Sequence, residues 1–185
     1  MDRLGIKDLV GQFLAFSRKQ VLEYKLFDIN ALVADFKSLI RRTIWKDIAI
    51  RIINSDDTLP VMADITQLHQ VNMNLCTNAA DAMPHGGELK ITTDELLLNV
   101  EADKSTFDLS SGKFVTLTVS DTGIGMDEQT VGKIFEPFFT TKGKEGTGLG
   151  LSTAYGIIKQ HGGTIMVDSD PGKGTTFDIY LPAVD

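Results

Sequence analysis

The chain has 185 residues, of which 42% are hydrophobic and 23% are charged, and its formal net charge is −7. A chain of this length can bury a hydrophobic core, and its single cysteine, Cys76, excludes an internal disulfide and suits a reducing compartment. The acidic balance argues against nucleic acid as a partner. The lack of a signal peptide and of any run of roughly 18 apolar residues predicts a cytoplasmic domain without direct membrane contact.

Two helices are predicted in the first quarter of the chain. Residues 3–19 carry apolar residues at helical spacing, and this stripe is apolar enough that we expect it to pack on something outside the chain or on a second copy. The second helix is predicted over 29–43, with Asp28 or Asn30 as its N-cap and two arginines at its C-terminal end, where the helix dipole favours cations.

A third helix follows a short extended region. A strand is predicted over 48–53 and an extended piece over 61–63. Asp64 is then the expected N-cap of a helix over 65–83, and Gln67, three residues later, completes a capping-box pattern.

The second half of the chain alternates strands, loops and one more helix. The expected elements are strands over 88–98 and 113–120 joined as a hairpin, a mobile glycine-rich loop over 121–150 with short helical turns, a helix over 147–160, and strands over 164–169 and 174–181. Helices interleaved with hairpin-connected strands predict an α+β two-layer sandwich rather than a doubly wound parallel sheet.

The third helix has two different faces. An apolar stripe is formed by Leu68, Val71, Leu75, Ala79 and Ala82, and a polar stripe by Gln70, Asn74, Asn78 and Asp81. Short polar side chains beside an apolar stripe indicate a helix at the wall of a cavity. The alternative is that the polar stripe faces solvent. Amide oxygens suit Mg²⁺, but one or two of them cannot hold it without phosphates. Asn72 lies off the polar stripe and is expected at the surface.

Two glycine-rich segments are candidates for ligand binding. In SDTGIGMD, residues 120–127, Gly123 and Gly125 would let the backbone approach a flat ligand and Asp121 is an acceptor-only carboxylate, but the same pattern is also ordinary turn chemistry. Further on, glycines stand where a loop is predicted to become a helix, so the unpaired N–H groups and the positive end of the helix dipole could bind an anion. The alternative is that these glycines only make the loop flexible. These glycines are Gly146, Gly148 and Gly150, with Lys142 and Lys144 as the nearest cations.

Between these segments lies KIFEPFFTTK, residues 133–142. Phe135, Phe138 and Phe139 would be costly to expose in a polar loop unless they dock on something. They are expected to latch the loop over a ligand or to present it to a partner domain, with a small local core as the alternative.

In this order, NLCTNAADAM, DTGIGM, IFEPFFTTK and GTGLGLSTAYGIIKQHGG resemble the four sequence boxes of the ATP-binding catalytic domain of sensor histidine kinases. That superfamily, with the Bergerat fold, also contains gyrase, heat-shock chaperone and mismatch-repair ATPases. The resemblance spans residues 64–181 and implies helices on one face of a mixed, mainly antiparallel sheet. It further implies that residues 1–22 are the end of a dimerisation domain and that residues 23–185 are the ATP-binding catalytic domain.

The resemblance also implies roles for individual residues. Asn78 would ligate Mg²⁺, Asn74 would assist near the phosphates, and Lys142 would be the cation of a lid over ATP. Asp121 would accept a hydrogen bond from the adenine amino group, with Thr176 beside the base. The implied nucleotide-binding set is Asn78, Asp81, Asp121, Gly123, Gly125, Lys142, Gly146, Thr147, Gly148, Leu149, Gly150 and Thr176, although many members carry a basic or aromatic residue at the position of Asp81.

Asn74 bears on the reaction. In the ATP-hydrolysing branches of the superfamily a glutamate that activates water stands there, and an amide cannot act as a general base. This favours transfer of the γ-phosphoryl group to a protein histidine. None of His69, His85 and His161 has the sequence context of a phosphoacceptor, so the acceptor is expected on the dimerisation domain; His161 is expected to suit the dipole at a helix C-terminus.

Several alternatives remain open from the residues. They are a degenerate nucleotide-binding or phosphotransfer module without kinase activity, a gyrase-type conformational ATPase, and a serine kinase of the anti-sigma type. The expected partners are the dimerisation domain and the receiver domain of a response regulator, and the fragment is expected to be a monomer or a weak dimer. The lid, about 127–146, is expected to be poorly ordered without nucleotide.

Overall fold

The computed structural model describes residues 22–44, 47–98, 111–143 and 146–184. The helix predicted over 3–19, nearly all of the segment 1–22, and Lys144 lie outside these residues. Within them, no helix is both long and apolar enough to cross a membrane.

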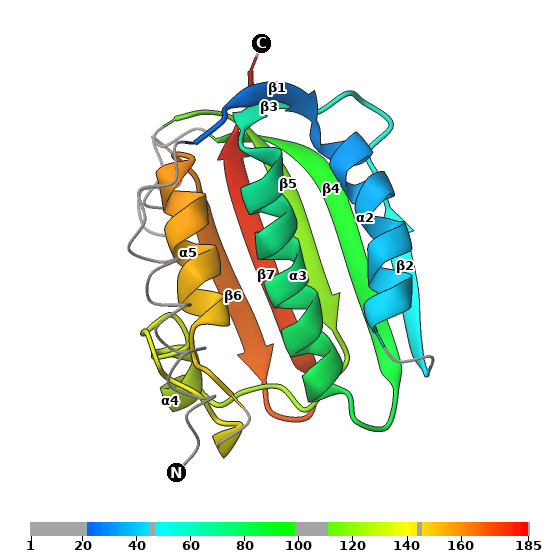
Figure 1. Cartoon of the computed structure of the whole chain (residues 1–185), viewed down its shortest axis with the longest axis vertical. Coiled ribbons are helices and arrows are strands. Elements are labelled where there is room, and N and C mark those ends of the chain that lie inside the picture. Colours follow the sequence, from blue (N-terminus) through cyan, green and yellow to red (C-terminus); the bar gives the residue numbers. More distant parts are fainter. Residues whose placement is uncertain (1–21, 45–46, 99–110, 144–145, 185) are drawn as a thin grey trace, which may run out of the picture.

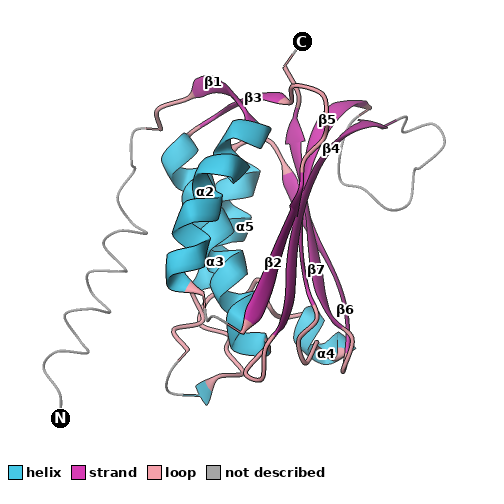
Figure 2. Ribbon diagram, turned by 90° about the vertical axis from the view of Figure 1, so that its right-hand side faces the viewer, coloured by secondary structure: helices cyan, strands magenta, loops and turns pink. Residues whose placement is uncertain are grey.

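The described residues form two layers, with helices on one face of a sheet (Figures 1 and 2). The sheet has the strand order β2 (Ile48–Ile53), β4 (Gly87–Leu98), β5 (Gly112–Asp121), β7 (Gly174–Pro182) and β6 (Thr164–Asp170). Only the pairing of β2 with β4 is parallel, and the other three are antiparallel. The predicted α+β sandwich with a mixed, mainly antiparallel sheet is therefore confirmed.

Three long helices cover the sheet: α2 (Ile29–Thr43), α3 (Ile65–Ala82) and α5 (Gly150–Gln160). The lid region contains the short α4 (Glu128–Val131), and α5 begins three residues later than predicted. A two-stranded antiparallel ribbon of β1 (Lys25–Asp28) and β3 (Pro60–Ala63) crosses one end of the molecule. The sequence analysis did not predict β1, whose four residues show no clear alternation.

Side-chain caps set the starts of α2 and α3. Asp28, not Asn30, caps α2, because its Oδ1 accepts from the backbone N–H groups of Asn30 and Leu59, both at 3.0 Å. Asp64 caps α3 by accepting from Thr66 and Gln67 at 2.9 and 3.2 Å. Each cap satisfies N–H groups that the helix itself cannot satisfy.

The capping box at α3 is only half formed. The backbone N–H of Asp64 donates to Nε2 of His161 at 3.0 Å instead of to the side chain of Gln67. Nδ1 of His161 lies 2.7 Å from the carbonyl oxygen of Ile157 and must carry the proton, since Nε2 is an acceptor. His161 is thus a buried histidine at the C-cap of α5, the helix end where it was expected, and its ring joins this end to the start of α3.

The core lies between the sheet and the helices. Four of the five residues of the apolar stripe, Leu68, Val71, Leu75 and Ala79, are buried as predicted, whereas Ala82 is half-buried. Asn72, which was expected at the surface, is only 2% exposed. The reason is that α3 is the central helix, with α5 and α2 on either side of it (Figure 1). His69, one turn before Asn72, contacts the ring of Phe36 on α2 with centroids 5.8 Å apart. Burial also raises the pKa of the Cys76 thiol to about 12.

Candidate functional site

A cavity of about 460 Å³ opens between α3, the end of β5, the lid region and the start of α5. This volume is within the usual range for small-molecule sites. Of the thirteen residues predicted for binding or catalysis, ten line the cavity: Asn74, Asn78, Asp81, Asp121, Gly125, Lys142, Gly146, Thr147, Gly148 and Gly150. The other three, Gly123, Leu149 and Thr176, do not.

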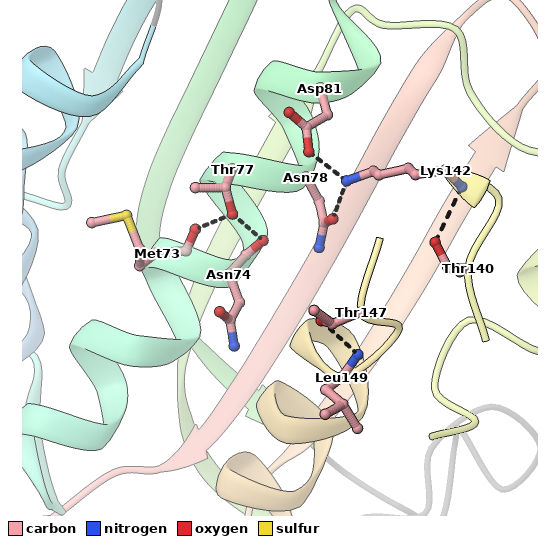
Figure 3. Close-up of polar contacts among 9 residues, drawn as sticks. All are labelled: Met73, Asn74, Thr77, Asn78, Asp81, Thr140, Lys142, Thr147 and Leu149. Carbon is pink, nitrogen blue, oxygen red and sulfur yellow. Dashed lines mark hydrogen bonds and ion pairs between the residues drawn. The ribbon is translucent and has the colours of Figure 1, made fainter. Parts of the chain in front are cut away.

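Asn74, Asn78 and Asp81 of the polar stripe form one wall of the cavity (Figure 3). Oδ1 of Asn78 accepts a hydrogen bond from Nζ of Lys142 at 2.7 Å, and Oδ2 of Asp81 accepts one from the same ammonium at 2.6 Å. The three side chains bring the lid to the helix, since Lys142 lies 61 residues after Asp81 in sequence. The cavity alternative is therefore correct for Asn74, Asn78 and Asp81, and the solvent-facing alternative is correct for Gln70, which is exposed.

Lys142 occupies the oxygen that a metal ion would need. An ammonium and Mg²⁺ cannot both use Oδ1 of Asn78, so metal binding there requires Lys142 to move. Among the described residues, no three His, Cys, Asp or Glu side chains are grouped to hold a metal ion. The hard oxygens of Asn78 and Asp81 fit Mg²⁺ only together with phosphate oxygens and water.

Asp121 lies at the end of β5 and is 6% exposed, with its carboxyl group at the cavity wall. Burial raises the pKa of Asp121, whereas hydrogen bonds from the backbone N–H groups of Gly123, at 2.8 Å, and of Thr175 act to lower it. The carboxyl group is therefore an oriented acceptor in a poorly solvated place, which suits recognition of an amino group.

The glycines beside Asp121 serve packing within the protein. A Cβ added at Gly123 would come within 2.7 Å of Cβ and O of Ala82 on α3. Gly125 has φ +65° and a Cβ there would overlap the carbonyl of Asp170. Both glycines let this loop pass between α3 and the β6–β7 turn, and of the two only Gly125 also lines the cavity.

Thr176 lies on the face of the sheet that points away from the cavity. It pairs with Ser120, and the two hydroxyl oxygens are 2.9 Å apart on the face away from the helices. Its neighbour Thr175 pairs with Asp121, is buried and lines the cavity. Because successive strand residues point to opposite faces, the sequence assignment is one residue off, and Thr175 takes the place given to Thr176.

The start of α5 is open toward the cavity. Its N-cap, Leu149, makes no side-chain cap hydrogen bond, and its own N–H lies 3.4 Å from Oγ1 of Thr147 (Figure 3). Gly148 has φ +66°, and a Cβ there would overlap the backbone of Phe138. The first N–H groups of α5 are consequently available to an anion, with the positive end of the helix dipole behind them.

The three phenylalanines of residues 133–142 differ in their surroundings. The ring of Phe135 contacts that of Tyr155 on α5, with centroids 5.2 Å apart, and Phe139 lines the cavity and packs against the core. Phe138 is 55% exposed, has φ 68°, and donates its N–H to the carbonyl of Gly148 at 2.9 Å. The local-core alternative is therefore correct for Phe135 and Phe139 and wrong for Phe138.

The sequence analysis missed the apolar wall of the cavity. It is formed by Ala79, Ala82, Ile124, Met126, Ile134, Phe139, Leu151 and Phe177. Ile124 is 66% exposed although it is a large apolar residue, and it stands between the two glycines of DTGIGM. An isoleucine between two glycines was the signal that could have identified this wall, because a large aliphatic side chain is costly to expose in a turn unless something covers it.

Comparison with known proteins agrees with this geometry. Residues 63–185 match the family described as histidine kinase-, DNA gyrase B-, and HSP90-like ATPase. The chain is 49% identical over 176 residues to the sensor kinase CckA of Brucella abortus (strain 2308), covering 94% of this chain and 18% of CckA. It spans about a fifth to a third of the length of the first curated relatives that it matches.

Solved structures of histidine kinases also match. The nucleotide-free catalytic domain of ThkA is 32% identical with a TM-score of 0.65, covering 86% of this chain and 95% of that one. ThkA in complex with the response regulator protein TrrA is 29% identical, with a TM-score of 0.69 and 97% and 47% coverage. Full-length ShkA in complex with AMPPNP is 25% identical, with a TM-score of 0.76 and 97% and 36% coverage. The chain therefore belongs to the histidine kinase-, DNA gyrase B- and HSP90-like ATPase family.

Proposed function

We propose that this chain is the ATP-binding catalytic domain of a two-component sensor histidine kinase. It binds Mg-ATP and donates the γ-phosphoryl group to a histidine on a dimerisation domain, for onward transfer to the receiver domain of a response regulator. The observation that carries the proposal is the convergence on one cavity of a buried acceptor, Asp121, an amide oxygen, Asn78, and the open N-terminus of α5. These three groups match a base, a metal ion and phosphates.

Each group has a defined task in this proposal. Asp121 accepts from the amino group of adenine, and Ile124 covers a face of the base. The first N–H groups of α5 hold the phosphates by charge-assisted hydrogen bonds, and Lys142, once released from Asn78, reaches them as a cation. Bound Mg²⁺ would be ligated by Asn78 and would neutralise phosphate charge.

Transfer to a histidine is favoured over hydrolysis. Asn74 stands where a general base for water would be needed, and an amide cannot accept that proton. Of the histidines in the chain, His161 is buried with both ring nitrogens hydrogen-bonded, so we place the acceptor on the dimerisation domain. The named relatives are kinases, and the ThkA–TrrA complex supports a response regulator as partner. A cytoplasmic location is consistent with a single free cysteine.

The first test is the metal ligand. We expect Asn78→Ala to lose the gain in ATP affinity that Mg²⁺ gives, while affinity for ADP in EDTA changes less than about threefold and the circular dichroism spectrum is unchanged. Gln70→Ala is the matched control, because Gln70 is an exposed polar residue on the same helix. An Asn78→Ala protein that bound Mg-ATP with wild-type affinity in calorimetric titrations would refute the assignment.

The second test separates the remaining functions. Incubation with γ-labelled ATP and a separately supplied dimerisation domain should label the histidine of that domain. Binding without transfer would favour a degenerate module, and rapid steady-state hydrolysis by the chain alone would favour a gyrase-type ATPase.

A further inference from the structure

We propose that Asn74 is a positioning residue whose side-chain amide holds the first turn of α5 in register with Asn78. Nδ2 of Asn74 donates a hydrogen bond to the carbonyl oxygen of Gly150 at 2.9 Å. Gly150 is the first residue of α5, so the bond ties the phosphate-binding end of that helix directly to α3. The inference deepens the proposed function and rests on it for its catalytic meaning.

The bond acts where two parts of the site must be aligned. Asn74 and Asn78 are one helical turn apart and project from the same side of α3, toward the segment that carries Thr147 and Leu149 (Figure 3). Asn78 is the proposed metal ligand, and the N–H groups that follow Leu149 are the proposed phosphate donors. A clamp one turn from Asn78 therefore sets the distance between the metal ligand and the phosphate donors.

Among the described residues, two further side-chain hydrogen bonds are local to the start of α5: Oγ of Ser152 donates to the carbonyl oxygen of Leu149 at 3.1 Å, and the N–H of Leu149 donates to Oγ1 of Thr147 at 3.4 Å. Leu149 supplies no side-chain cap, and Gly148 and Gly150 flank it. A Cβ built at Gly150 would lie 3.8 Å from Cγ of Asn74, in ordinary contact, so the two backbones are close without being crowded. The carbonyl of Gly150 has a second lone pair besides the one used within the helix, and Asn74 uses it.

The clamp requires an amide. A carboxylate at position 74 has the same shape as asparagine but no N–H, and it would set an anion against the Gly150 carbonyl and near the phosphates. Asparagine at this position therefore has two effects: it provides no general base, and it supplies the donor that orders the phosphate site.

The experiment uses the 185-residue chain with Asn74→Ala, Asn74→Gln and, as control, the exposed Gln70→Ala. A positioning role acts on the phosphate donors whether or not metal is present. We therefore expect Asn74→Ala to weaken ADP binding about three- to tenfold in EDTA and by the same factor in Mg²⁺, since a hydrogen bond of this kind is worth about that much. Asn74→Gln keeps a donor and should restore part of the affinity.

A second readout needs no nucleotide. Amide exchange in the first turn of α5, residues 150–153, should accelerate in Asn74→Ala, stay closer to wild type in Asn74→Gln, and be unchanged in Gln70→Ala. A loss of affinity confined to Mg²⁺ would show that Asn74 acts at the metal and would overturn the proposal. Unchanged affinity with unchanged α5 exchange would overturn it as well.

These outcomes are distinct from failure of the proposed function. If the wild-type chain binds neither ADP nor ATP, the proposed function fails, and the exchange of α5 still decides whether the clamp exists. If wild type binds and the Asn74 variants behave as wild type, only the clamp is wrong.

Discussion

Asp121 links the chemistry of the cavity to pH. Burial raises its pKa above the ordinary value of 3.8 in the nucleotide-free protein, in spite of the two backbone N–H groups that favour the carboxylate. Because the folded pKa is the higher one, the folded state binds more protons in the window between 3.8 and that pKa. The free energy of unfolding therefore decreases as pH rises through this window, so the ionised carboxylate is a stability cost that the nucleotide-free site carries.

We predict that binding of the nucleotide relieves this cost. An amino group donating to Asp121 favours the ionised form, so ADP affinity in EDTA should fall as pH is lowered through the raised pKa of Asp121. Calorimetric titrations between pH 8 and pH 5 measure this. The phosphates of ADP titrate in the same range, so the readout is the difference from Asp121→Asn, which lacks the carboxyl group. Equal pH dependence in the two proteins would contradict the prediction.

Lys142 shows how one residue can serve two states. In the structure Lys142 donates to Asn78 and Asp81, and in the proposed function it contacts phosphates only after it leaves them. The ion pair with Asp81 is half-exposed, and such pairs contribute little to stability. Release of the lid lysine is therefore cheap, which suits a group that must change partners when Mg-ATP enters.

Helix α3 depends on how its first turn is held. Asp64 accepts from two N–H groups of α3 and from the backbone N–H of Glu23 at 3.1 Å, and its own N–H is bound by His161. Burial acts to raise the pKa of Asp64, but the hydrogen bonds from Glu23, Gln67 and Thr66 together outweigh it and lower the pKa. The carboxylate of Asp64 thus joins the segment before β1 to α3, and its backbone N–H joins α3 to His161 at the end of α5.

We expect Asp64→Ala to lower the free energy of unfolding by about 1–2 kcal/mol at pH 7, the usual cost of losing an N-cap. The stabilisation is complete above the unfolded pKa and disappears as pH falls through the lowered folded pKa, so the two proteins should converge in strong acid. Urea denaturation at several pH values measures this. Asp56→Ala, at an exposed carboxylate in the turn after β2, should change the value by less than about 0.5 kcal/mol. A deficit that persists unchanged in acid would contradict the assignment.

The arrangement of the helices also explains why Asn72 of α3 is buried although the sequence pattern placed it at the surface. Asn72 lies off both stripes, yet it is buried; His69, three residues earlier, contacts Phe36 of α2, so α2 covers that side of α3. Its Oδ1 is buried without a hydrogen-bond partner among the described residues. A two-stripe pattern describes a helix with one buried face, whereas α3 is enclosed by the sheet and by helices on both sides.

For the molecule as a whole, the cavity is the place where bound nucleotide changes stability and order. The described lid residues pack by few large side chains, and Phe138 stays exposed. We predict that amides over 136–143 and 146–149 exchange rapidly in nucleotide-free protein and slowly with saturating Mg-ADP. The melting temperature should rise in parallel, because ligand at a hundred times its dissociation constant adds about 2.7 kcal/mol. Strong protection of these amides without nucleotide would contradict this view of the lid.

Most of the fold was predictable because its signals are local. The helices predicted over 29–43 and 65–83 were identified from apolar spacing and candidate N-caps, and the structure places them at 29–43 and 65–82. The strands of the five-stranded sheet were identified from alternation and turns. β1 was missed because its four residues are ordered by pairing with β3, a contact that its own sequence does not announce. The parallel pairing of β2 with β4 likewise depends on the path of the chain around α3.

The sequence by itself determined most of the elements, the family and ten of the residues that line the cavity, since propensity, periodicity and motif order are written along the chain. Only the tertiary structure decided which side chains meet there. It put Thr175 rather than Thr176 at the cavity, because strand residues alternate faces and a shift of one residue reverses them. It brought His161 to Asp64, whose backbone N–H donates to the imidazole ring. It also brought Lys142 to Asn78 and Asp81, and Asn74 to the carbonyl oxygen of Gly150. These contacts join residues 61 to 97 positions apart, and only packing brings such residues together.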